Sequence, residues 1–286
     1  MKNALLVSAL GVGLALGFAN VANADQTQFT DFEGFALGSV NGQNGWGVSD
    51  SAFDQEIVDF GGNTVWRVSN AVTSGAFGNQ PFAPRLGGTA MASTTPTGNS
   101  PGAFAGELST GTTLTKFKGK FSFRSATGTP QPGARITVSA DNGQGGRQSF
   151  IAINDTGAGL EISTFDVDIG GNFIGPIVIA SGLSYTKWHT TSVQVQFKDG
   201  EADDVVKYFV NGKRKHTGPS WEQFYTNFQP VEHPNGVPVQ TLLFRISGTA
   251  VPAVLGGGYY IDKVKMSVSE SDIDQDEKHD SDGGKK

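Results

Sequence analysis

The chain alternates apolar and polar residues with a period of two over many short segments. In the stretch KFKGKFSFR, residues 116–124, every second position from Phe117 is apolar or glycine, and the positions between them are basic or serine. Such a period places alternate side chains on opposite faces of a β-strand. The same alternation recurs in ARITVSA (134–140), TSVQVQF (191–197), LLFRIS (242–247) and GYYIDKVKMSV (258–268). The pattern predicts antiparallel strands that each bury one face.

Helical periodicity is confined to one short segment. Residues 219–227, PSWEQFYTN, carry apolar side chains at the i, i+3 and i+4 spacing of a single short helix or turn. The 40 glycines and 20 phenylalanines also favour strands and turns over helices. The sequence therefore predicts an all-β fold, a two-sheet antiparallel sandwich with few or no helices.

The densest basic run lies in a predicted β-hairpin. In VVKYFVNGKRKHTG, residues 205–218, Asn211 and Gly212 are the residues that best accept the positive φ angles of a type I′ turn. Strict alternation places Lys213 and Lys215 on one face and Arg214 and His216 on the other. The pleat thus divides the charge between two faces, and a solvated hairpin is favoured over a ligand-facing site.

Three segments are expected along the chain. Residues 1–24 have the features of a secretory signal peptide: Lys2, an apolar run and the cleavage sequence Ala22-Asn23-Ala24. Residues 25–270 are expected to form a single β-sandwich domain, with long loops over 71–114. The acidic stretch 271–286 is expected to be a disordered tail. The mature protein is therefore expected to be secreted or periplasmic, with no membrane span.

Composition excludes several classes of function. The chain contains no cysteine, which removes disulfides, thiol catalysis and thiolate metal sites. Its net charge of −6 is unfavourable for nucleic acid and for anionic membrane surfaces, because both require a basic face. A partner is instead expected among polysaccharides or glycoconjugates, or among other copies of the chain.

A resemblance covers nearly the whole mature chain. Residues 184–218, SYTKWHTTSVQVQFKDGEADDVVKYFVNGKRKHTG, resemble the core strands of concanavalin A-like, laminin G-type jelly-roll domains. The opening TDFEGFALGSVNGQNGWGV (30–48) and the closing GGGYYIDKVKMSV (256–268) are similar to the first and last strands of exported bacterial members. The resemblance implies a jelly roll with one concave sheet. Its members bind glycans there or on rim loops, and some cleave them.

The catalytic patterns of that class are not matched. Laminarinase-type hydrolases carry three carboxylates on one face of a strand, whereas Glu161 here lies on the opposite face from Asp166 and Asp168. The alginate-lyase pattern is matched only at Tyr208. No catalytic residue is assigned, and a polysaccharide lyase or glycoside hydrolase with an atypical site remains an alternative.

A structural Ca²⁺ is the cofactor that the resemblance implies. Glu33 alternates with Phe29 and Phe35, and Asp262 alternates with Tyr260 and Val264. A carboxylate on an apolar face requires a partner or a metal, and in bacterial jelly rolls carboxylates at similar places in the first and last strands hold Ca²⁺. Solvent-exposed edge positions and hydrogen bonds to loop amides are the alternatives.

Arginines and aromatic residues provide the candidate ligand contacts. Arg124, Arg135 and Arg147 occupy outward faces of three predicted strands, and would form one polar floor if those strands were neighbours. Trp221 and Tyr225 form either a stacking platform or a plug at one end of the sandwich, while Trp46, Trp66 and Trp188 are expected in the core. The chain is thus expected to be a glycan-binding or cell-surface interaction module, with a matrix or fibre subunit as a further alternative.

Overall fold

The computed structural model describes residues 26–48, 55–69, 81–82, 114–142, 145–198, 200–231, 237–246, 248, 250–254 and 256–269. The expected signal peptide and acidic tail lie outside these residues, as do nearly all of the long loops expected over 71–114.

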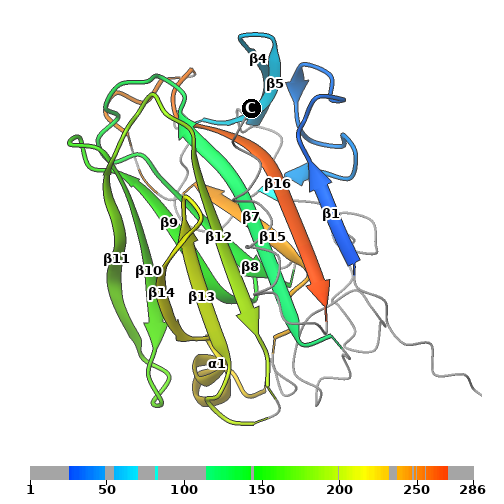
Figure 1. The fold of residues 1–286 in the computed structure, drawn as a ribbon, viewed down its shortest axis with the longest axis vertical. Coiled ribbons are helices and arrows are strands. Elements are labelled where there is room, and N and C mark those ends of the chain that lie inside the picture. The colour runs from blue at the N-terminus through cyan, green and yellow to red at the C-terminus, as the bar shows by residue number, and fades with distance from the viewer. Residues whose placement is uncertain are drawn as a thin grey trace, which may run out of the picture.

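The described strands form two antiparallel sheets that pack face to face (Figure 1). Sheet A is 9-stranded and has the order β14 (Lys213–Pro219), β13 (Val205–Val210), β12 (His189–Gln196), β7 (Lys116–Ser125), β16 (Tyr259–Ser269), β5 (Asn63–Val68), β4 (Gln55–Phe60) and β2 (Gly38–Ser39), with β1 (Gln26–Thr30) also paired to β16. Sheet B is 7-stranded and has the order β11 (Phe173–Leu183), β10 (Leu160–Val167), β9 (Arg147–Asp155), β8 (Arg135–Asp141), β15 (Thr241–Ile246), β6 (Pro81–Phe82) and β3 (Gly47–Val48). The predicted two-sheet sandwich is confirmed.

The main core lies between the two sheets and is rich in aromatic side chains. Phe121 of β7 in sheet A meets Phe244 of β15 in sheet B edge to face, with ring centroids 5.2 Å apart. Trp46 and Trp66 are buried and their rings lie 5.2 Å apart. The core face predicted for residues 116–124 is confirmed, because Phe117, Phe121 and Phe123 are all buried.

The predicted hairpin forms between β13 and β14. Asn211 and Gly212 have φ angles of 50° and 74°, as a type I′ turn requires. Lys213, Arg214 and Lys215 are exposed, as a solvated hairpin predicts. One detail of the alternation is wrong: a bulge pairs Tyr208 with His216 and Phe209 with Arg214. Arg214 and His216 therefore do not share a face, since the bulge turns His216 toward the interior.

The predicted short helix is α1 (Glu222–Phe228). Its first turn is supported by Ser220, whose Oγ accepts a hydrogen bond from the Glu222 backbone N–H at 3.1 Å. Trp221 and Tyr225, together with Val167 and Val237, form a second, smaller apolar cluster beside Phe150 and Phe224. Among the described residues, no helix has the length and apolarity needed to cross a membrane.

Candidate functional site

Three residues predicted to contact a ligand meet where β9 begins. Tyr225 of α1 accepts a hydrogen bond from the Arg147 backbone N–H at 2.7 Å, and its hydroxyl donates to the Arg147 carbonyl at 2.9 Å. The Arg147 guanidinium carbon lies 5.8 Å from the ring centre of Trp221. The helix therefore holds Arg147 in place through both its backbone and its side chain.

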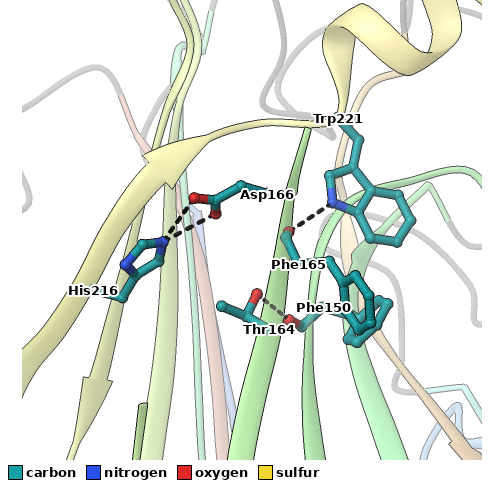
Figure 2. A network of polar contacts seen from close by, with 6 residues as sticks. All are labelled: Phe150, Thr164, Phe165, Asp166, His216 and Trp221. Carbon is teal, nitrogen blue, oxygen red and sulfur yellow. Dashed lines mark hydrogen bonds and ion pairs between the residues drawn. The ribbon is translucent and has the colours of Figure 1, made fainter. Parts of the chain in front are cut away.

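Trp221 is a plug and not an exposed stacking platform, because only 5% of its surface is accessible. Its indole Nε1 donates to the Phe165 carbonyl at 3.2 Å (Figure 2). Its ring packs edge to face against Phe150 at 5.3 Å and against Phe173 at 4.6 Å. Trp221 thus seals α1 onto the outer ends of β9, β10 and β11.

Two further charged residues, which the sequence reasoning missed, belong to the Arg147 cluster. Asp141 ends β8 opposite Arg147, and Arg245 lies on β15. The pKa of Arg245 is lowered to about 10, chiefly by burial and also by the nearby Arg147 guanidinium, while the Asp141 carboxylate opposes the shift. Burial likewise lowers the pKa of Arg147 and raises that of Tyr225 to about 12. The cluster thus combines two desolvated guanidinium groups and one carboxylate.

Three polar side-chain atoms without a hydrogen-bond partner lie on the same sheet. Thr137 and Ser139 alternate along β8 with the core residues Ile136 and Val138, so their side chains point away from the core. Thr137, Ser139 and Gln148 are only 6%, 1% and 2% exposed. Within the described part of the chain, Thr137 Oγ1, Ser139 Oγ and Gln148 Oε1 make no hydrogen bond.

These groups are neighbours because of the strand register. Arg245 lies opposite Thr137 across β15 and β8. Ser139 lies opposite Phe150, which packs against Trp221. Gln148 Nε2 donates to the Val237 carbonyl at 2.8 Å, which leaves only its amide oxygen unpaired. We refer to Thr137, Ser139, Asp141, Arg147, Gln148 and Arg245 as the sheet B polar site.

Arg135 lies on the same side of sheet B as Thr137 but at the other end of β8. It pairs with Asn154 of β9, and Asn154 in turn pairs with Glu161 of β10. Arg147, by contrast, pairs with Asp141 at the far end of the β8–β9 ladder. Arg135 and Arg147 therefore share one sheet without being in contact.

Arg124 does not belong to this floor, which corrects the prediction of three neighbouring arginine strands. It lies on β7 in sheet A, because the chain crosses to sheet B between β7 and β8. Its guanidinium carbon lies 4.5 Å from the ring centre of Phe60 and 6.0 Å from that of Trp188. Trp188 is 37% exposed and is not a core residue, contrary to the expectation from sequence.

The two carboxylates predicted to bind Ca²⁺ lie in one region, although Glu33 is not on an apolar strand face. Glu33 is exposed in the turn after β1, and its Oε2 accepts a hydrogen bond from the Thr64 backbone N–H at 3.3 Å. Burial raises the pKa of Asp262 on β16, and the carboxylates of Asp31 and Glu33 raise it further. Carboxylate oxygens are the hard ligands that suit Ca²⁺, but these three carboxylates are not among the acidic groups of the described residues whose oxygens all lie within 4.8 Å of one another. A Ca²⁺ site at Glu33 and Asp262 therefore stays a prediction.

A second acidic group lies between the β12–β13 connection and α1. One carboxylate oxygen from each of Asp203, Asp204 and Glu222 lies within 4.8 Å of the others. Protein groups already bond to two of the three: Ser220 Oγ donates to Asp204 at 2.8 Å, and the Ala202 N–H donates to Glu222 at 3.0 Å. Asp204 and Glu222 therefore join the loop to the helix, whereas Asp203 Oδ1 is buried and makes no hydrogen bond among the described residues.

A hydrogen-bonded contact between a histidine and a carboxylate joins the two sheets beside the polar site. His216 Nε2 of β14 lies 3.0 Å from Asp166 Oδ1 and 2.9 Å from Oδ2 (Figure 2). The neighbouring Tyr208 ring stacks on the His216 ring, with centroids 5.8 Å apart. Desolvation by burial strongly raises the pKa of Tyr208, and the Asp166 carboxylate raises it further. The contact fixes the sheet edges at the end that holds α1.

Comparison with known proteins assigns the chain to no family. No family model matches the chain, and no curated protein matches it. Among solved structures, alginate lyase vAL-1 from Chlorella virus is 12% identical, with a TM-score of 0.44 over 82% of this chain and 99% of that one. Lectin UEA-II in complex with galactose is 10% identical, with a TM-score of 0.43 over 85% and 98% of the two chains. Alginate lyase A1-II′ is 11% identical, with a TM-score of 0.41 over 78% and 85%.

These three structures are jelly-roll sandwiches of the concanavalin A-like class that the sequence resembles. Because their TM-scores lie below 0.5, they carry no information about the activity or ligand of this chain.

Proposed function

We propose that the protein is an exported glycan-binding protein whose ligand contacts the sheet B polar site. The observation that carries this proposal is the set of buried side-chain atoms without hydrogen-bond partners: Thr137 Oγ1, Ser139 Oγ and Gln148 Oε1. A buried polar group left unpaired costs about 1–3 kcal/mol. A ligand that reached these atoms would supply the hydrogen bonds that they lack among the described residues.

The chemistry of the site suits a saccharide. Hydroxyl and amide groups match the many donors and acceptors of a sugar ring, and ligand sites typically combine a few such groups with apolar surface. The apolar part is supplied by Phe150, which lies opposite Ser139 and packs on the Trp221 plug. Arg147 and Arg245 add donors that pair with hydroxyl, carboxylate or sulfate oxygens.

The proposal predicts that binding and stability respond differently to one double substitution. Thr137→Val with Ser139→Ala removes two hydroxyls that have no partner, so stability should stay within about 0.5 kcal/mol of the parent or rise. Affinity for a bound saccharide should fall by about tenfold or more, because each lost ligand hydrogen bond weakens binding.

The experiment is a titration of the full chain with neutral and uronic-acid polysaccharides, followed by calorimetry and thermal unfolding. The matched control is Ser122→Ala with Thr190→Val, a pair of hydroxyls 3.4 Å apart in sheet A. The control should retain its affinity. If no saccharide binds the parent, or if the control loses as much affinity as the test variant, the proposal fails. Assays for released reducing ends or unsaturated products would then separate a binding protein from an enzyme.

A further inference from the structure

Sheet A carries several lysines on its outward face, on strands that lie close together. Each of these lysines is adjacent in sequence to a residue of the hydrophobic core, so the pleat turns its side chain away from the core. Their strands are β7, β13 and β16, which lie in one half of the sheet (Figure 1). Strands β7, β12 and β13 contain no acidic residue. We refer to Lys116, Lys118, Lys120, Lys207 and Lys265 as the lysine face.

The strand register brings these positive charges together. Lys120 lies directly opposite Lys265 across β7 and β16. Lys118 and Lys207 lie on either side of Gln194, which pairs with both of them from β12. Like charges opposite one another on neighbouring strands are destabilising. The lysine face therefore favours an anion close to it, because an anion would offset this repulsion.

Gln194 provides an independent sign of the same ligand chemistry. It lies between the core residues Val193 and Val195, so its side chain points outward among the lysines. It is nevertheless only 4% exposed, and its Nε2 makes no hydrogen bond among the described residues. An amide N–H between two ammonium groups requires a group that only accepts hydrogen bonds, and an ionised carboxylate is such a group.

The sequence that follows β16 supplies carboxylates at the right place. Residues 270–282, ESDIDQDEKHDSD, carry seven carboxylates and one lysine, a net charge of −6 that equals the net charge of the whole chain. This acidic segment lies outside the described residues. It follows directly after Ser269, which lies opposite Lys116 at the end of the lysine face. An extended chain of 13 residues reaches about 40 Å, whereas Lys116 to Lys120 spans about 13 Å.

We propose that the acidic segment 270–282 binds the lysine face of its own chain and thereby masks it. Charge complementarity selects this partner, and the covalent link gives it an effective concentration of the order of millimolar without any diffusing ligand. Salt weakens the contact, because charges at a surface are screened over about 10 Å at 0.1 M salt. The net charge of −6 thus conceals a basic face, which an external polyanion reaches only by displacing the segment.

The first test is carbodiimide cross-linking of the full chain at low protein concentration, read by mass spectrometry. A carbodiimide condenses a carboxylate and a lysine amine into an amide only where the two groups are in contact. Cross-links should join the acidic segment to Lys118, Lys120 and Lys207 within one chain, and should fall by about fivefold or more between about 0.05 and 0.5 M salt. The control lysines are Lys213 and Lys215, which are exposed at the opposite end of the β12–β13–β14 ladder.

Equally frequent cross-links to the control lysines, or cross-links that form only between two copies, would overturn the proposal. A complete absence of cross-links from the segment to the lysine face would do the same.

A second test measures whether neutralising the segment opens the face. The variant combines Asp272→Asn, Asp274→Asn, Asp276→Asn and Glu277→Gln. A fluorescent peptide of residues 270–282 should bind this variant about tenfold or more tightly than it binds the parent, because the parent's own segment competes. Adding Lys118→Gln and Lys207→Gln to the variant should remove the binding.

The matched control adds Lys213→Gln and Lys215→Gln instead and should keep it. Equal binding of the peptide to the parent and to the variant would show that the segment does not cover the face. Saccharide binding should be the same in parent and variant, so failure here is distinguishable from failure of the sheet B polar site.

Discussion

His216 and Asp166 join the two sheets of the sandwich through a hydrogen bond, with His216 Nε2 lying 2.9 Å from Asp166 Oδ2. His216 lies on β14 at the edge of sheet A, and Asp166 lies on β10 of sheet B. The bulge in β14 is what turns His216 inward toward Asp166, since it pairs His216 with Tyr208. Gly218 on the same strand allows the approach, because a Cβ there would collide with the Asp166 carboxylate. The edge of the sandwich is therefore closed by a specific polar contact.

Removing one partner of this pair should destabilise the fold. His216→Ala should lower the free energy of unfolding by about 1–3 kcal/mol, because the partly buried Asp166 carboxylate loses its hydrogen-bond donor. Arg214→Ala is the control, since Arg214 is exposed on the same strand and should change stability by less than about 0.5 kcal/mol. Urea unfolding measures the free energy of unfolding of both variants. Equal effects of the two substitutions would show that the sheets do not depend on the pair.

The Tyr225 hydroxyl should be essential for the position of α1. Tyr225→Phe removes the group that bonds both the N–H and the carbonyl of Arg147. These buried groups would be left unpaired, at a cost of about 1–3 kcal/mol. The melting temperature should fall by about 2–4 °C for each kcal/mol of stability lost. The control is Tyr260→Phe, because the Tyr260 side chain is only half-buried on the sheet A face. An equal loss of stability in Tyr260→Phe would contradict the role assigned to the Tyr225 hydroxyl.

The local features of the fold were predictable because local sequence determines them. Alternation identified Phe117, Phe121 and Phe123 as core residues, since the pleat fixes which side chains share a face. The positive φ angles of Asn211 and Gly212 followed from the few residues that tolerate them. The error at His216 arose from a bulge, which shifts the alternation by one residue without a sequence signal of its own.

The site was harder to predict because it depends on which strands are neighbours. Arg124 and Arg135 both alternate with apolar residues, yet they lie in different sheets because the chain crosses over between β7 and β8. Asp141 and Arg245 are 104 residues apart in sequence (245 minus 141) and meet only because β8 pairs with β15. Their outward position on two alternating strands could be predicted from the sequence. Which strands pair with one another could not. Trp188 precedes its strand, where alternation says nothing about burial.

Asp262 should make stability depend on pH and on calcium. Its pKa is raised in the fold, so its favourable contribution to stability is present below the unfolded pKa and is lost as the pH rises through the folded pKa. In EDTA at neutral pH, Asp262→Asn should therefore be more stable than the parent. Calcium should raise the melting temperature of the parent and not of the variant, because Ca²⁺ binds the carboxylate only in the native arrangement.

Thermal unfolding from acidic to neutral pH, with calcium and with EDTA, measures both effects. Glu201→Gln removes an exposed carboxylate elsewhere and should behave as the parent does. An identical calcium response in the parent and in Asp262→Asn would exclude Asp262 as a ligand, and no response in either would exclude the site.

Trp188 should be the tryptophan that solvent reaches. It is 37% exposed, whereas Trp46, Trp66 and Trp221 are at most 5% exposed. Acrylamide should quench part of the parent fluorescence, and Trp188→Phe should remove that part. Arg124→Ala should increase the quenching of Trp188, because the guanidinium lies over the Phe60 ring and near the Trp188 ring and contributes about 0.5–1 kcal/mol to holding them. Unchanged quenching in Arg124→Ala would mean that the β4–β5 hairpin keeps its position without this arginine. Arg124 would then again be a candidate ligand contact.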